Sequence, residues 1–221
     1  MKHRLLLPLL AAGFAAASAM PALAEQPLPD SCKPKVAGVA LALADDADAA
    51  QLQCDVDRAA ILEKRSEAMF GPVINPLVQI VDTASPSGAA YVYAVSDVQG
   101  AMILDARTVP PDPDNAGKVP VCHLRTLMPE DAARKVSIAL LETASPDVPG
   151  YAERMKVVVN PDGSHQSVLL LDSHDVITTV QTASGERHFS RNAEQDDKVS
   201  TLNQSIIGVA NISDGWDCNA P

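Results

Sequence analysis

The stretch from Val73 to Val109, VINPLVQIVDTASPSGAAYVYAVSDVQGAMILDARTV, decides the fold. Its residues form three short runs rich in β-branched and aromatic side chains, at 73–81, 89–95 and 101–109. Turn-forming sequences separate these runs, Ser-Pro-Ser-Gly after the first and Asp-Val-Gln-Gly after the second. Tyr91, Tyr93 and Val95 alternate with other residues, which places them on one face of a half-buried strand. The stretch therefore predicts three strands joined by hairpins.

On the N-terminal side of this stretch, residues 47–70 predict a helix. Acidic residues at 45–48 complement the positive end of a helix dipole and can cap its free N–H groups. Apolar residues then recur roughly on one helical face. Gly71 followed by Pro72 predicts the end of the helix.

On the C-terminal side, a proline-rich loop at 110–118 precedes further strands and a second helix. The predicted strands are 119–127, 154–159, 166–171, 176–182 and 186–190, and the second helix runs from Pro129 to about 143. Asn160-Pro161-Asp162-Gly163 and Ser184-Gly185 predict hairpin turns. Residues 198–212 are compatible with strand or helix. The sequence thus predicts an α+β fold, a mostly antiparallel sheet of hairpins with two helices.

Residues 1–24 have the three parts of a cleavable signal peptide. Lys2, His3 and Arg4 form a positive start, an uncharged Leu/Ala-rich run follows at 5–19, and Ala22-Leu23-Ala24 matches the cleavage pattern. The run is too short and too rich in alanine to span a bilayer well, although an uncleaved N-terminal anchor is the alternative. We expect cleavage after Ala24, which leaves residues 25–221 as a single exported α+β domain, periplasmic or secreted, with no transmembrane segment.

The charge balance argues against nucleic acid and anionic lipid as partners. Of the 17 basic residues, Lys2 and Arg4 leave with the signal peptide, so 15 remain against 28 acidic ones, a net charge of −13. Binding to nucleic acid or to an anionic membrane requires a basic patch. The remaining basic residues are scattered along the chain instead.

Four cysteines remain after cleavage, namely Cys32, Cys54, Cys122 and Cys218. An even number in an exported protein indicates disulfide bonds, with three possible connectivities. We favour Cys32–Cys54 with Cys122–Cys218, because the first two are nearest in sequence and closing a short loop costs less entropy. The other two connectivities remain open at this point. No C-x-x-C occurs, so neither a thioredoxin-like redox site nor a typical zinc site is predicted.

The densest polar cluster is Asp172-Ser173-His174-Asp175, between two predicted strands. Asp172 and His174 would share a strand face and could offer two ligands to a metal ion, with His165 or His188 as a third. We interpret the cluster instead as a polar turn that bonds its own backbone, so no metal site is predicted.

No nucleophile elbow, glycine-rich phosphate loop or other catalytic or cofactor motif is found, and no cofactor is predicted. We interpret the protein as a non-enzymatic accessory or binding domain of the cell envelope that presents an antiparallel sheet to a protein partner. The alternative is a small hydrolase or metal-dependent enzyme with its site near His174. A carboxylate or second histidine converging on His174 in a concave site would favour that alternative.

Overall fold

The computed structural model describes Cys32 and residues 44–83, 88–111, 119–152, 155–169 and 174–218. The predicted signal peptide, most of the predicted loop at 110–118, and both Asp172 and Ser173 lie outside the described residues. In chain order the elements are α1 (Ala44–Phe70), β1 (Pro76–Asp82), β2 (Ala90–Val98), β3 (Ala101–Val109), β4 (His123–Leu127), α2 (Glu130–Thr143), β5 (Met155–Val159), β6 (His165–Leu169), β7 (Asp175–Thr182), β8 (Gly185–Asn192) and α3 (Lys198–Ile212).

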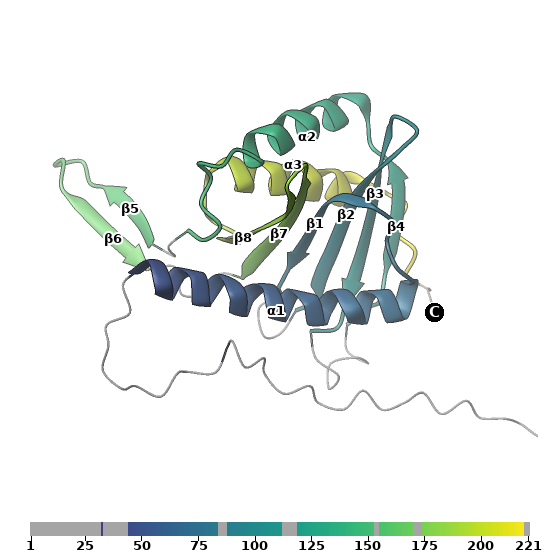
Figure 1. Ribbon diagram of the computed structural model, residues 1–221, viewed down its shortest axis with the longest axis horizontal. Helices are drawn as coiled ribbons and strands as arrows, with labels where there is room; N and C mark the ends of the chain where they lie inside the picture. The colour runs from purple at the N-terminus through teal and green to yellow at the C-terminus, as the bar shows by residue number, and fades with distance from the viewer. Residues whose placement is uncertain are drawn as a thin grey trace, which may run out of the picture.

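Six strands form one antiparallel sheet in the order β4-β3-β2-β1-β7-β8 (Figure 1). Strands β1 to β4 follow one another in the sheet, as successive hairpins predict. The β7–β8 hairpin then joins the sheet beside β1, where Asp82 pairs with Val176. Strands β5 and β6 form a separate two-stranded sheet. The predicted α+β fold of antiparallel hairpins is confirmed.

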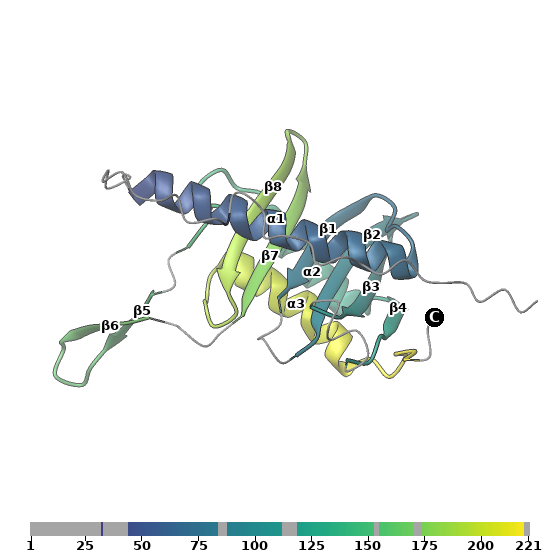
Figure 2. The same cartoon turned by 90° about the horizontal axis from the view of Figure 1, so that it is seen from below.

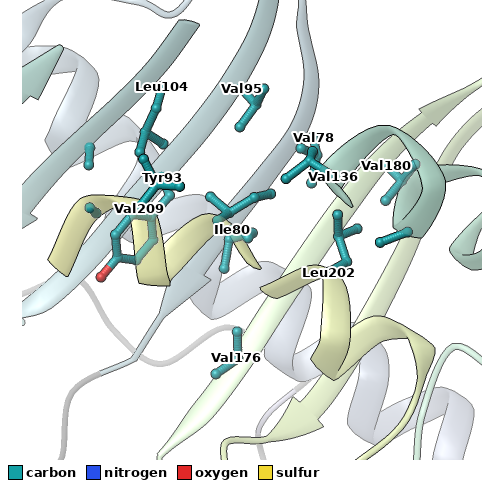
Figure 3. Packing of buried hydrophobic residues seen from close by; sticks show 14 of the residues in the cluster. Val78, Ile80, Tyr93, Val95, Leu104, Val136, Val176, Val180, Leu202 and Val209 are labelled. Atoms are coloured by element: carbon teal, nitrogen blue, oxygen red, sulfur yellow. The ribbon is translucent and has the colours of Figure 1, made fainter. Parts of the chain in front are cut away.

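Helices cover both faces of the six-stranded sheet, with α1 across one face and α2 and α3 across the other (Figure 1). Because side chains alternate along each strand, strands β1, β2, β3 and β7 contribute to two cores, one on each face of the sheet. The larger core lies under α2 and α3 and contains Ile80, Tyr93, Leu104, Val136 and Leu202, all at most 3 % exposed (Figure 3). Tyr91 and Val95 lie on this same side, as their alternation predicts.

Helix α1 confirms the helix predicted at 47–70. Its buried face repeats at helical spacing through Asp55, Ala59, Leu62 and Ser66, so two of its buried residues are polar. The Asp55 carboxylate accepts a hydrogen bond of 2.5 Å from the Ser190 hydroxyl, which ties the helix to β8. At the C-terminal end, Gly71 has a φ of +82° and its N–H bonds the carbonyl of Glu67, the usual helix stop.

The tail segment at 198–212 is helix α3, so the fold contains three described helices where the sequence predicted two. The Asp197 side chain caps the first turn by accepting a 2.8 Å bond from the Ser200 N–H. Val199, Leu202, Ile206 and Val209 are buried at helical spacing against the sheet. The helix is therefore stabilised both at its end and along its apolar face.

Two predicted strands begin later than expected. Strand β1 begins at Pro76 because Asn75 adopts a left-handed φ of +48°, which is incompatible with a strand. Strand β4 begins at His123 because the Cys122 N–H bonds the side-chain hydroxyl of Thr108 instead of a neighbouring carbonyl.

The four cysteines form two disulfides, Cys32–Cys54 and Cys122–Cys218, in the connectivity that sequence separation favours. The first joins Cys32, which precedes α1 in the chain, to that helix. The second joins the residue before β4 to the C-terminal tail, where His123 and Asp217 exchange two backbone hydrogen bonds of 2.8 Å. Trp216 also donates to the Ala210 carbonyl, so the tail is held by several contacts.

Candidate functional site

His174 lies just before β7 and contacts the carboxylate of Asp82, the last residue of β1. The antiparallel register of β1 and β7 brings these two strand ends together. The His174 Nε2 atom lies 2.9 Å from Asp82 Oδ1. Asp82 is 92 residues away in sequence, so no local motif could have indicated this partner.

Hydrogen bonds between Thr83 and Asp175 hold together the two strand ends that carry the pair. The backbone N–H and the hydroxyl of Thr83 both donate to the Asp175 carbonyl, each at 2.9 Å. The Asp175 N–H returns a bond of 3.1 Å to the Thr83 hydroxyl. Thr83 and Asp175 directly follow Asp82 and His174 in the sequence. Their hydrogen bonds therefore limit how far the Asp82–His174 pair can move.

The pair lies at a cavity of about 210 Å³ between the N-terminal end of β7, the C-terminal end of β8 and the first three turns of α3. Val176, Ala193 and Ile207 form its apolar wall, whereas Arg191, Ser200 and Asn203 add polar groups. A small, largely apolar cavity with a few convergent polar groups is typical of a ligand-binding site.

The Ser200 hydroxyl is buried and makes no hydrogen bond of full geometry within the described part of the chain, but it interacts with the carboxylate of Asp197 and helps to lower the pKa of that group. The residue is 5 % exposed and lies in the first turn of α3, lining the cavity. A buried hydroxyl without a partner costs about 1–3 kcal/mol. The interaction with Asp197 offsets part of this cost.

Arg191 supplies a buried positive charge to the same cavity wall. Its Nε atom lies 2.6 Å from Asp197 Oδ2, and its other nitrogens donate to the carbonyls of Pro149, Gly150 and Ser190. Burial acts to raise the pKa of Asp197, but the bonds from Ser200 and Arg191 outweigh it and hold this pKa below its ordinary value. Both charges therefore persist at neutral pH.

Asp82 contributes a carboxyl group to the cavity lining. Burial raises the pKa of its carboxyl, and the neighbouring His174 offsets part of that rise. The carboxylate also acts on Tyr93: burial first, and then the charge of Asp82, raise the pKa of this phenol above its ordinary value. The cavity lining thus contains a carboxylate and an imidazole, and the phenol of Tyr93 lies in the adjoining core near the carboxylate.

The remaining histidines considered as metal ligands lie elsewhere in the fold. His188 is on β8, where its Nδ1 atom lies 3.0 Å from the Thr179 hydroxyl. His165 belongs to β6 of the separate hairpin. Across the described residues, no three His, Cys, Asp or Glu side chains lie close enough together to hold a metal ion.

A second polar cluster lies between the C-terminal end of α1 and strands β3 and β4. Asp105 Oδ1 lies 2.6 Å from Arg107 Nε and 3.2 Å from His123 Nε2. Arg107 also donates to the Gly71 carbonyl and the Ser66 hydroxyl. Because Arg107 is bonded on several sides to α1 and its end, we interpret this cluster as a structural tie between helix and sheet.

The β5–β6 hairpin is the other unusual feature. It extends away from the rest of the molecule (Figures 1 and 2) and makes no extensive contact with any other described helix or strand. Its turn is a three-residue loop: the Gly163 N–H bonds the Asn160 carbonyl, and the Asn160 N–H bonds the Ser164 carbonyl. Gly163 has a φ of +80°, as this loop type requires.

No protein-family model, curated protein or solved structure matches the chain. None of the helices among the described residues combines the length and the apolar character needed to cross a membrane.

Proposed function

We propose that this protein is an exported, non-enzymatic binding domain of the cell envelope, formed by residues 25–221, that engages a protein partner. The signal-peptide pattern at residues 1–24 supports export. Two disulfides are compatible with an oxidising compartment such as the periplasm or the extracellular medium.

The single observation that carries the binding function is the projecting β5–β6 hairpin. A two-stranded sheet without further packing is marginally stable at best. Within the described part of the chain, neither outer edge of the hairpin pairs with another strand. Unpaired edges can accept a strand of another protein, a common mode of peptide recognition. A partner strand would both stabilise the hairpin and give the protein its binding function.

The six-stranded sheet is a poorer docking surface than the sequence led us to expect. Helices lie across both of its faces (Figure 1), which leaves less of the sheet open to a partner. Its edge strands are also partly occupied: β4 pairs with the tail at Asp217, and β8 pairs with Tyr151. We therefore propose the hairpin, and not the six-stranded sheet, as the surface that engages the partner.

Site-specific photo-crosslinking in exporting cells tests this proposal. A photoreactive residue at Gln166 on β6 should give one defined protein adduct. The same residue at Lys135, exposed on α2, should not give that adduct. Equal adducts from both positions, or none from either, would contradict binding at the hairpin.

Proline substitutions then test whether strand pairing holds the partner. The turn bonds place Val157 and Ser167 in a pair whose N–H groups point away from each other. Val157→Pro or Ser167→Pro therefore removes an outward donor from one edge and leaves the hairpin's own bonds. One of the two should abolish the Gln166 adduct, whereas Ser167→Ala should not. An adduct that persists in both proline variants would exclude strand addition.

Export has its own test. The intact mass of the protein from the periplasm or the medium should correspond to a chain beginning at Glu25. A mass that includes Met1 would contradict the cleavage, whatever the result at the hairpin.

The alternative function, a small hydrolase, is favoured by one observation: a carboxylate contacts His174 at a cavity that also contains a serine. In a Ser/His/Asp hydrolase the acid orients the histidine, and the histidine activates the serine through a hydrogen bond. Ser200 makes no such bond to His174. A fluorophosphonate probe distinguishes the two functions, because labelling of Ser200 that is lost in His174→Ala would favour the hydrolase.

A further inference from the structure

The outer face of α2 carries two exposed apolar side chains. Within the described part of the chain, only α3 packs extensively against α2, which lies at the edge of the molecule in Figure 1. The buried side of α2 contains Val136, Ala139 and Thr143. Ile138 and Leu141 lie one turn apart on the other side and are 53 % and 77 % exposed. Neighbouring exposed apolar side chains with a charged border are typical of an interaction surface.

The charged border of this face contains two unpaired groups. Arg134 has its counter-charges in its own helix, since its Nη2 atom lies 3.2 Å from Glu130 Oε1 and 3.7 Å from Asp131 Oδ1. Lys135 and Glu142 are both exposed, and neither makes an ion pair or a side-chain hydrogen bond with any described residue. They are seven residues apart, so they lie on the same flank of α2 but do not contact each other.

These groups are complementary to a second copy of themselves. In two antiparallel α2 helices related by a twofold axis near Ile138, Lys135 of each copy lies beside Glu142 of the other, because the two positions are equally distant from that axis. The same axis places Leu141 of each copy near Ile138 of the other. A twofold contact uses one patch twice, so every unpaired charge gains a partner and every exposed apolar side chain is covered.

We propose that the outer face of α2 binds a second copy of this chain in an antiparallel, twofold-symmetric helix pair. Ile138 and Leu141 form the apolar centre of the contact, and two Lys135–Glu142 ion pairs fix its register. The proposal does not depend on the hairpin, so either can fail without the other.

The contact is small, so the dimer should be reversible. Each partner in a standard interface buries about 800 Å², which is more than the outer face of one 14-residue helix provides. Exposed ion pairs add little affinity, so the apolar centre supplies most of it and the ion pairs mainly determine the orientation.

Sedimentation velocity of the protein purified from exporting cells tests the self-association. We expect a monomer–dimer equilibrium with a Kd of about 10–100 μM. Leu141→Asp should weaken the dimer at least about tenfold, because it buries a carboxylate in the apolar centre. Ile74→Asp is the matched control, since Ile74 is 68 % exposed but lies between α1 and β1. A protein that stays monomeric at about 1 mM, or an equal loss in both variants, would overturn the proposal.

Charge reversal tests the antiparallel register. Lys135→Glu places two pairs of like charges in the contact and should weaken the dimer several-fold. Adding Glu142→Lys to the same chain restores both ion pairs and should return the Kd to within about twofold of the native value. The two positions do not contact each other within one helix, so this rescue can arise only between copies. No weakening in Lys135→Glu, or no rescue in the double variant, would overturn the proposal.

The two other possible contacts are separated by the hairpin variants and by crosslinking. The dimer should persist in Val157→Pro and in Ser167→Pro, and its loss in either would place the contact at the hairpin and overturn the proposal. A photoreactive residue at Lys135 should link the chain only to a second copy, an adduct that its mass distinguishes from the partner adduct at Gln166. A different protein captured at Lys135 would overturn the choice of a second copy.

Discussion

Arg191 is the largest side chain that the described part of the molecule buries completely, at 1 % exposed. A buried cation is tolerated only where it is paired and fully hydrogen-bonded. Asp197 and three backbone carbonyls meet that requirement here. Asp197 also caps α3, so one carboxylate stabilises both a buried charge and a helix end.

Asp197→Ala should therefore destabilise the fold more than an ordinary helix-cap substitution. Removal of one partner of a buried pair costs about 3–5 kcal/mol. The Asp197 side chain is 35 % exposed, which reduces the loss to about 2–3 kcal/mol through solvent screening. Urea unfolding at pH 7 measures this loss of unfolding free energy. Asp196→Ala, at the exposed neighbouring position, should change stability by less than about 0.5 kcal/mol, and an equal loss in both variants would contradict the role of Asp197.

The Asp197 carboxylate also makes the stability of the fold depend on pH, in a direction that follows from its lowered pKa. Because its folded pKa is depressed, its stabilising contribution is fully present above its unfolded pKa of about 3.9 and is lost as the pH falls through the lower folded value. The stability difference between the native protein and Asp197→Asn should thus be constant from pH 7 to about pH 5 and shrink below about pH 4. A difference that grows on acidification would reverse the sign of this argument.

At the scale of elements, the hairpin turn is specified by a few residues. Gly163 adopts a left-handed φ of +80°, and Asp162 accepts bonds from both the N–H and the hydroxyl of Ser164. These bonds lower the pKa of the Asp162 carboxyl. The turn was recognisable in the sequence because this chemistry is local.

Gly163→Ala should open the hairpin without unfolding the rest of the protein. A left-handed conformation costs a residue with a Cβ about 1–2 kcal/mol. Hydrogen exchange of the β5 and β6 amides should accelerate by about fivefold or more, while the global unfolding free energy changes little because the hairpin is a separate sheet. Pro161→Ala, in the same loop, should have little effect. A global loss as large as the local one would show that the hairpin folds together with the main sheet.

Alanine substitutions at two other glycines should change the stability of the protein in opposite directions. Gly208 lies inside α3 with open space where a Cβ would stand, so Gly208→Ala should stabilise the protein by about 0.5–1 kcal/mol through helix propensity. At Gly150 a Cβ would lie 2.8 Å from Leu52 Cδ2 and 3.2 Å from the His188 carbonyl oxygen. Gly150→Ala should therefore lower the thermal midpoint, and a higher midpoint in that variant would contradict the packing.

Elements with strong local signals were predictable from the sequence, and others were not. Helix α1 had an acidic start and a glycine stop, but its buried Asp55 and Ser66 could not be identified, because their partners lie on strands far along the chain. The tail helix was recognisable in principle: Asp197 precedes an apolar spacing of three and four residues from Val199 onward. The same segment is also rich in β-branched residues, and these obscured the helical spacing in the sequence.

At the scale of the whole molecule, the sequence predicts hairpins but not how they assemble. Nothing local indicates that β7 pairs with β1, and this pairing is what brings His174 to Asp82. The cavity depends on a further long-range contact, the packing of α3 across these strands. From the sequence, the site could therefore be predicted only as the local cluster around His174, whereas its partner Asp82 required the three-dimensional fold.

The two disulfides should stabilise the molecule unequally, because they close loops of different length. Their cysteines are separated by 22 residues in Cys32–Cys54 and by 96 in Cys122–Cys218. The chain-entropy relation assigns them about 3 and about 5 kcal/mol respectively. Replacing both cysteines of one bridge by serine, in two separate double variants, and unfolding each in guanidinium chloride measures the difference. We expect the Cys122/Cys218 variant to lose more, although the backbone bonds between His123 and Asp217 will retain part of the tail's attachment. An equal or reversed order would show that local contacts, and not loop closure, determine what each bridge contributes.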